Sequence, residues 1–357
     1  MVFFLLILLL LMFVEAKVAP EGAFATDYMS KDKTSAIKGI FVILIVFSHF
    51  SQYVTLGGSY DAPYLSLKAH LNQMVVAMFW FYSGYGIMES VTKKGFAYVK
   101  TIPTRRFLTV LLNFDLAILL FLIVGAFLGN TYSLSTILWS LIGWKSVGNS
   151  NWYIFATLVL YLLTFLSFLL LKWRQTRPAH YAAVMLLTVL TIVFVYVQMK
   201  MGRPGYCYNT LILFPLGCWY SLLRNKVETI IMRNDLVYAL AGLLVLAAYA
   251  VSFRYRFSKG IEAYTVWAVA FTLLVVLITM KITFYNAFLT WFGNHVFSVY
   301  ILQRIPMMIL SHLGLAQNHK YVFLIVSFIG TIVLAMLFDW LTGKLHEKLY
   351  RARLAKG

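Results

Sequence analysis

Residues 37–54 read IKGIFVILIVFSHFSQYV, an apolar stretch that holds one lysine and one histidine. A transmembrane helix needs about 20 mostly apolar residues, and this stretch is too apolar on all sides for an amphipathic surface helix. Nine similar stretches follow it, at 70–91, 107–128, 152–171, 180–199, 208–223, 236–253, 262–280, 288–310 and 321–342. The sequence therefore predicts an all-α fold, a polytopic membrane bundle of ten core transmembrane helices.

The composition of the 357-residue chain agrees with this prediction, because 62% of its residues are hydrophobic and only 12% are charged. A soluble domain is usually about 45–50% apolar and about 25% charged. These values exclude a soluble enzyme, a coiled coil and a disordered regulator. The net charge of +18 would suggest a nucleic-acid partner on a soluble protein. Here it indicates topology, and we expect the lipid bilayer, not nucleic acid, as the partner.

The basic residues divide unevenly between the two sides of the predicted bundle. With the segment before Ile37 placed inside, 21 of the 30 Lys and Arg residues fall on the inner side, 8 on the outer side, and Arg304 within a span. The positive-inside rule then places both ends of the ten-span unit, and hence the C-terminus, in the cytoplasm. We divide the chain into an N-terminal hydrophobic segment with a cytoplasmic linker (1–33), the membrane domain (34–345) and a basic cytoplasmic tail (346–357).

The first 14 residues, MVFFLLILLLLMFV, are short for a span and lack the positive n-region of a secretory signal. Lys17 follows them, which favours a reverse anchor with its N-terminus outside. An uncleaved signal and a misassigned start remain open as alternatives. Between the third and fourth spans, SLSTILWSLIGW (133–144) has the composition of a half-helix lying at the membrane interface.

Ionisable residues inside membrane spans are costly and therefore indicate functional sites. Lys38 and His49 are eleven residues apart, which places them on one helix face and about 16 Å apart along the axis. A buried neutral histidine suits a general base; the structural alternative is a hydrogen bond between helices. Ser83 in FWFYSGYGIMES lies about 15 Å, and Asp115 about 13 Å, from the inner end of its span. Both therefore lie at a depth similar to that of His49. Asp115 could orient His49, and Ser83 with its flanking glycines could instead form a packing surface.

The ninth stretch, WFGNHVFSVYILQRIP (291–306), is polar enough to line a wet cavity, and Pro306 can kink it. The inner loop 92–106 carries five basic residues and no acid. Its charges fit the positive-inside signal, anionic lipid head groups, or a polyphosphorylated ligand. The chain has no metal-binding, nucleotide-binding or serine-elbow motif, so we expect no metal.

These segments together resemble the acyltransferase-3 family of polytopic membrane acyltransferases. Lys38 to His49 resembles the R-x10-H motif of that family, and FWFYSGYGIMES resembles its second-span SGF segment. The basic stretch before the third span, NWYIFATLVLYLL from Asn151, and FGNHVFSVYILQRIP follow in the family's order over about residues 34–345. Three positions depart from the family pattern: Lys38 replaces Arg, Arg105-Arg106 stand in for R-x-x-R, and Gln303 replaces a frequent His.

The resemblance implies transfer of an acyl group, usually acetyl, from cytoplasmic acyl-coenzyme A to a hydroxyl of an extracytoplasmic glycan or glycolipid, in a bacterial cytoplasmic membrane. The catalytic candidates are His49, as base or acyl relay, with Asp115 and Ser83. The candidates for binding the coenzyme A phosphates are Lys38, Lys93, Lys94, Lys100, Arg105 and Arg106. The candidates for binding the acceptor are Trp152, Asn294, Tyr300, Gln303 and Arg304. Two alternatives remain open: a transporter or exporter of a small anion or glycan intermediate, and an inactive relative that serves in assembly.

Overall fold

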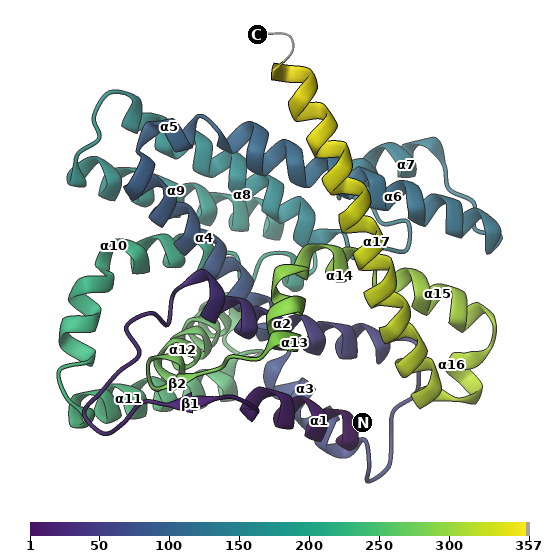
Figure 1. Cartoon of the computed structure of the whole chain (residues 1–357), viewed down its shortest axis with the longest axis horizontal. Coiled ribbons are helices and arrows are strands. Elements are labelled where there is room, and N and C mark those ends of the chain that lie inside the picture. The colour runs from purple at the N-terminus through teal and green to yellow at the C-terminus, as the bar shows by residue number, and fades with distance from the viewer. Residues whose placement is uncertain (355–357) are drawn as a thin grey trace.

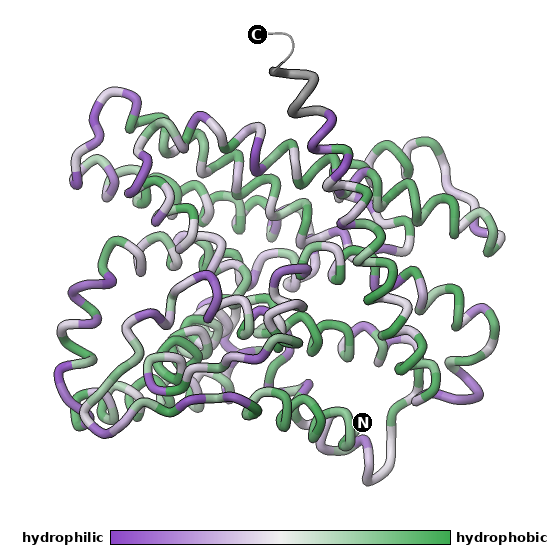
Figure 2. Tube along the Cα trace, viewed as in Figure 1, coloured by the Kyte–Doolittle hydropathy of each residue, from purple (hydrophilic) through white to green (hydrophobic). Residues whose placement is uncertain are grey.

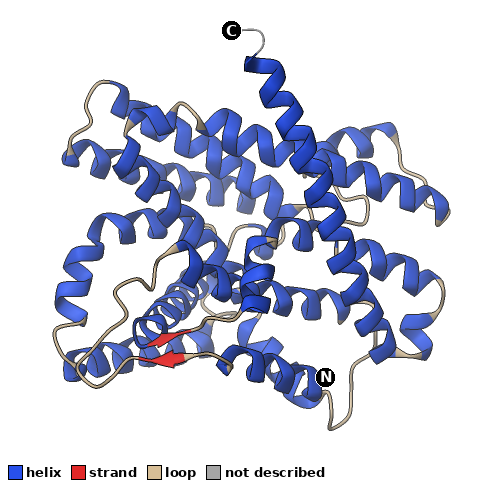
Figure 3. Cartoon of the chain, in the orientation of Figure 1, coloured by secondary structure: helices blue, strands red, loops and turns tan. Residues whose placement is uncertain are grey.

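A computed structural model describes residues 1–354, with side chains described up to residue 348. The regular structure of the described chain is helical except for one pair of two-residue strands, and loops and turns connect the helices (Figure 3). The basic tail predicted at 346–357 lies partly outside the described residues. The elements in chain order are α1 Val2–Phe13, β1 Lys17–Val18, α2 Lys31–Phe50, α3 Ala62–Leu71, α4 Met74–Lys94, α5 Phe96–Val99, η1 Pro103–Leu108, α6 Thr109–Phe127, α7 Leu134–Leu141, α8 Trp152–Phe168, η2 Leu169–Lys172, α9 Arg177–Lys200, η3 Gly205–Cys207, α10 Leu213–Ile231, α11 Asp235–Tyr255, α12 Gly260–Lys281, β2 Ile282–Thr283, α13 Ala287–Asn294, α14 Val296–Leu302, α15 Arg304–His312, α16 Leu315–Asn318 and α17 Lys320–Leu354.

Each of the ten predicted stretches falls on a helix or on a row of short helices, which confirms the all-α fold. Seven segments are long and apolar enough to cross a membrane, and they contain α2, α6, α8, α9, α11, α12 and α17. The stretches 70–91, 208–223 and 288–310 lie on α4, α10 and α13–α15, which are outside this set of seven. The third of them is divided by breaks at His295 and Gln303. The structure thus supports a polytopic helix bundle without establishing the count of ten.

The helices lie in two groups in Figure 1, with α6, α8 and α9 in one and α1, α2, α11 and α12 in the other. The long helix α17 runs obliquely across both groups. Most helical segments are coloured apolar in Figure 2, while polar colours gather at turns and helix ends. This distribution is the one expected for helices that share a hydrocarbon layer and expose their ends to water.

Two helix pairs approach each other through glycines. A Cβ added at Gly39 of α2 would lie 1.9 Å from the carbonyl oxygen of Leu289, and one at Gly293 of α13 would lie 1.7 Å from that of Ser35. The α4–α10 pair meets in the same way, through Gly84 and Gly217. Small residues allow such backbone contact between membrane helices. The packing surface anticipated around Ser83 therefore exists at Gly84, whereas Gly86 faces open space.

The N-terminal helix α1 runs opposite in direction to α2. Its first residue, Met1, donates from its ammonium group to Asp61 (2.9 Å), beyond the end of α2. The chain after α1 forms β1, which pairs antiparallel with β2 just before α13. The reverse anchor proposed for this segment stays a prediction. At 12 residues and about 18 Å, however, α1 is shorter than the hydrocarbon layer of about 30 Å.

Asp61 holds this end of α1 to two other parts of the chain. Lys320 (2.7 Å) and Tyr321 (2.7 Å) of α17 also donate to its carboxylate. Although burial alone would raise the pKa of Asp61, hydrogen bonds from Lys320, Tyr321 and Met1 hold it well below its usual range. The carboxylate therefore stays charged and links α1, α3 and α17.

Candidate active site

The candidate site is built around α2, which carries Lys38 and His49. Ser30 caps this helix by accepting a hydrogen bond from the Lys33 amide (3.4 Å), and the apolar run that follows is almost completely buried. Because α2 lies among α4, α13, α14 and α17, Lys38 and His49 face cavities within the protein.

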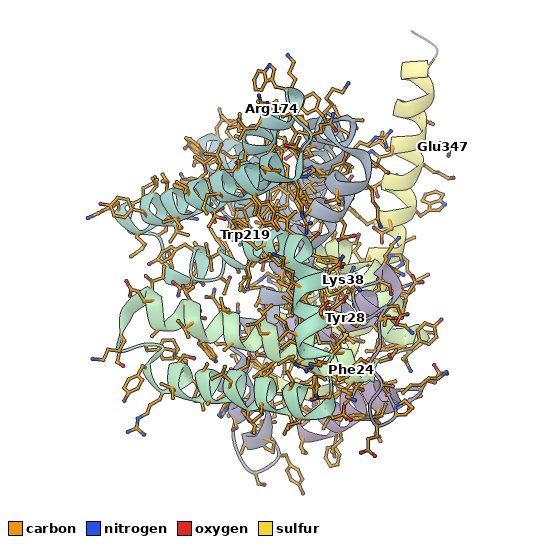
Figure 4. The ribbon with its side chains drawn as sticks, turned by 90° about the vertical axis from the view of Figure 1, so that its left-hand side faces the viewer. Phe24, Tyr28, Lys38, Arg174, Trp219 and Glu347 are labelled. Atoms are coloured by element: carbon orange, nitrogen blue, oxygen red, sulfur yellow. The ribbon has the colours of Figure 1, made fainter. Side chains whose placement is uncertain are left out.

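Lys38 opens into a cavity of about 360 Å³, which we call the Lys38 cavity. Its wall includes Lys38, Trp80, Ser83, Arg106, Tyr153 and Tyr161. Figure 4 looks onto the molecule from the left-hand side of Figure 1 and labels Lys38 of α2. Two cations, several hydroxyl groups and several aromatic rings thus surround a mainly apolar space.

His49 opens into a second cavity of about 570 Å³, which we call the His49 cavity. Its polar wall includes Gln52, Asn72, Gln73, Asn149, Asn151 and Arg304. Two aromatic side chains, Trp152 and Tyr206, line it as well, with their ring centroids 5.9 Å apart and their planes at 63°. Amide groups beside aromatic rings suit a ligand with both hydroxyl groups and apolar faces.

The two cavities share three lining residues, Ile45, Val76 and Tyr300, which we call the junction. The Tyr300 ring lies 6.2 Å from the His49 ring and 5.4 Å from the Tyr153 ring. Because the junction belongs to both walls, a group that passes it moves from the side of Lys38 to the side of His49.

At the far side of the junction, a chain of hydrogen bonds ends on His49. Arg304 donates from Nε to Ser150 Oγ (2.9 Å), and Ser150 Oγ lies 3.3 Å from His49 Nε2. Arg304 also donates to Gln52 Oε1 (2.5 Å), which fixes the guanidinium. A hydroxyl that accepts from Arg304 keeps its own proton to donate to Nε2. In the tautomer that carries the ring proton on Nδ1, Nε2 accepts from Ser150, as a general base requires.

The predicted phosphate-binding residues separate into two sets. Lys38 and Arg106 line the Lys38 cavity, and Arg106 is held by the Tyr98 hydroxyl (3.2 Å). The other four are exposed and line neither cavity; they are Lys93, Lys94, Lys100 and Arg105. Lys93 forms only a 3.8 Å ion pair with Glu89 and keeps a 74% exposed side chain.

The other predicted residues are also divided. Trp152, Tyr300 and Arg304 line the His49 cavity, and Ser83 lines the Lys38 cavity. Gln303 is fully buried next to the His49 ring and donates to the Tyr300 carbonyl (3.0 Å), so it contacts protein and no cavity.

Asp115 and Asn294 are not brought to His49. Asn294 accepts from Ser35 (3.1 Å), and Asp115 lines neither cavity. The orienting role predicted for Asp115 therefore stays a prediction, and the structure offers no contact for it among the described residues.

Sequence reasoning missed two polar groups. Ser150 precedes the fourth predicted span, where NSNW reads as an ordinary loop, and only the fold brings it to His49. Asp339 of α17 bonds both His295 Nδ1 and Ser298 Oγ. The sequence did contain a signal for Asp339, because an acidic residue inside the tenth predicted membrane stretch is costly and therefore indicates a functional site. No group of three or more His, Cys, Asp or Glu suited to a metal occurs among residues 1–354.

The fold and the two cavities define a class of protein: a polytopic membrane protein in which a histidine lines a polar cavity that meets a cationic cavity. The model of the acyltransferase domain of the acyltransferase-3 family matches residues 35–340, and the chain belongs to this family of membrane acyltransferases. No individual curated protein and no solved structure matches the chain significantly.

Proposed function

We propose that the protein transfers an acyl group, acetyl in the first instance, from acyl-coenzyme A to a hydroxyl of an extracytoplasmic glycan or glycolipid. One observation carries the proposal: the Lys38 cavity and the His49 cavity meet at Tyr300, beside the only histidine that lines either of them. A donor and an acceptor held in different cavities would meet at this histidine.

The donor belongs in the Lys38 cavity. Lys38 and Arg106 supply charge for phosphate oxygens at its mouth. Neither forms an ion pair with a described acid, so no carboxylate neutralises the charge that each offers to a phosphate-bearing ligand. The remaining wall, formed by Phe79, Trp80 and Tyr153, suits a slender and partly apolar pantetheine arm. The exposed residues Lys93, Lys94, Lys100 and Arg105 would add a general attraction for the anionic donor.

The acceptor belongs in the His49 cavity. Its asparagine and glutamine side chains can pair with sugar hydroxyls, and Trp152 offers a flat apolar surface to a sugar ring. His49 Nε2 removes a hydroxyl proton, and Arg304 stabilises the negative charge that develops nearby. We place the Lys38 end and the C-terminus in the cytoplasm of a bacterial inner membrane, in agreement with the positive-inside rule.

The test compares surface glycans by mass spectrometry from wild type, a deletion strain and a strain carrying His49→Ala. We expect an acyl mass increment that is lost in both mutants while the variant is inserted at normal levels. His312→Ala, an exposed histidine at the end of α15, is the matched control and should retain the increment. Unchanged glycans in the deletion strain, together with no binding of coenzyme A to the purified protein, would overturn the proposal.

A transporter makes a different prediction in the same strains. The deletion strain would then lack a glycan, or accumulate its intermediate inside the cell, without a change in acylation. The purified protein would not release coenzyme A from acetyl-coenzyme A.

A further inference from the structure

The surroundings of His49 leave little room for a direct attack by the acceptor. Its Nδ1 is inaccessible to solvent, and its Nε2 is occupied by the Ser150 hydroxyl at 3.3 Å. The hydroxyl group that His49 is placed to deprotonate is therefore that of Ser150.

Ser150 has the environment of an activated nucleophile. A serine hydroxyl is a weak nucleophile until an adjacent base removes its proton. Ser150 has that base in His49, and the guanidinium of Arg304 lies on the other side of the oxygen (Nε to Oγ, 2.9 Å). The positive charge stabilises the alkoxide that forms as the proton leaves. Nucleophile, base and cation thus stand in one hydrogen-bonded row.

The backbone around Ser150 is fixed by its own hydrogen bonds. Ser146 donates to the Asn149 carbonyl (2.7 Å), and the Val147 amide donates to the Asn149 side chain (3.0 Å). Helix α8 begins two residues later, at Trp152. Such support is what a catalytic group needs to keep its geometry. Ser150 itself is 7% exposed and lines the His49 cavity together with Tyr300 of the junction.

We infer that Ser150 carries the acyl group as an ester between the two halves of the reaction. In the first half, the Ser150 proton passes to His49 Nε2 while Oγ bonds to the thioester carbonyl carbon. The carbon–sulfur bond then breaks, and the sulfur leaves as a thiol after taking that proton from Nε2. In the second half, the acceptor hydroxyl gives its proton to Nε2 and bonds to the acyl carbon. The ester bond to Oγ breaks, and Ser150 recovers its proton.

These two half-reactions explain how His49 can act on both the donor and the acceptor, although they bind in different cavities. Only the acyl group needs to pass the junction at Tyr300, so donor and acceptor need never be bound together. The inference rests on the proposed acyl transfer and adds the covalent intermediate to it.

The first test needs no acceptor. Purified protein is mixed with acetyl-coenzyme A and isotopically labelled free coenzyme A, and label entering acetyl-coenzyme A is measured. An acyl-serine intermediate predicts exchange by wild type and a loss of at least about 1,000-fold in Ser150→Ala. Ser150→Cys, which keeps a nucleophile, should retain exchange. Ser140→Ala is the control, because Ser140 is buried in α7, bonds the Ile137 carbonyl and lines neither cavity.

The second test locates the acyl group. After incubation with acetyl-coenzyme A and acid quenching, mass spectrometry of the Ser150 peptide should show an added acetyl in wild type and none in Ser150→Ala. Acetyl found on His49 would overturn the inference, as would Ser150→Ala that retains exchange.

The outcomes separate this inference from the proposed function. Acylated glycans in vivo and coenzyme A binding, without exchange by the wild type, would leave the acyltransferase standing and remove the serine intermediate. Loss of all three signals would overturn both.

Discussion

The Lys38 cavity and the His49 cavity share three residues but differ in the way their polar groups are held. The cations of the Lys38 cavity have no acidic partner among the described residues, and Arg106 is restrained by the hydroxyls of Tyr98 and Tyr161. In the His49 cavity, Arg304 is tied to both Ser150 and Gln52, and His49 is the end of that chain. One cavity leaves its charges without an acidic partner, and the other holds its cation by two hydrogen bonds, which agrees with the donor-binding and catalytic roles that we propose for them.

If the proposed function is correct, binding and chemistry are divided along one helix. Helix α2 contributes Lys38 to the first cavity, Ile45 to the junction and His49 to the second. Variants at the two ends of α2 should therefore change different kinetic constants.

The largest effect is expected for His49→Ala. Removing the base should lower the rate of acyl transfer by about 10²–10⁴-fold, while binding of coenzyme A, measured by calorimetry, should stay within about twofold. A parallel loss of donor binding would mean that the two cavities are not separate in function.

Lys38→Gln and Arg106→Gln should act on the donor alone. A hydrogen bond to a charged group contributes about 1.5–3 kcal/mol, so each change should raise the KM for acetyl-coenzyme A by about 10-fold or more. Lys38→Arg should restore most of the affinity, because the charge is kept. The comparison fails if the KM for the acceptor rises by as much as that for the donor.

Trp152→Ala tests the opposite cavity. Loss of a flat aromatic surface in a sugar site should raise the KM for the acceptor about 10-fold and leave the donor KM unchanged. Trp173→Ala, an exposed tryptophan outside both cavities, is the matched control. Equal effects of the two variants would indicate a general loss of folding.

The smallest effect is expected for Lys93→Gln, Lys94→Gln and Lys100→Gln. Their side chains are exposed, and exposed charges contribute about 0–1 kcal/mol. Each change should raise the donor KM by about twofold or less, and the difference should vanish in 0.5 M salt because of screening. A change as large as that of Lys38→Gln would place the phosphates outside the Lys38 cavity.

The part of the fold that follows from local pattern could be predicted. Long apolar runs locate the helices, and SLSTILWSLIGW forms α7 with Ser133 as its N-cap (3.2 Å to the Thr136 amide). The break at Gln303 lies three residues before Pro306, where a proline removes a backbone donor and crowds the preceding turn. The break at His295 has no such signal in the local sequence. It coincides with a contact between His295 and Asp339, which lies 44 positions away on α17.

The candidate site was predictable where it lies on one helix. The spacing of Lys38 and His49 fixes their shared face, so both open into cavities that meet. Depth alone did not predict partners: Asp115 matches His49 in depth but lies on α6 and contacts it nowhere among the described residues. Ser150 comes from a loop 101 positions away, and helical periodicity says nothing about where a loop folds.

The glycine contacts have a consequence for motion. Helices α2 and α13 touch backbone to backbone, and so do α4 and α10, so each pair has no slack for internal bending. The junction takes Ile45 from the first pair and Val76 from the second. Its width is therefore set by the displacement of one rigid pair against the other. A passage between the two sides of the molecule would open and close as one helix pair slides against the other. The side chain of Tyr300 would have to fit at the junction in both the open and the closed arrangement.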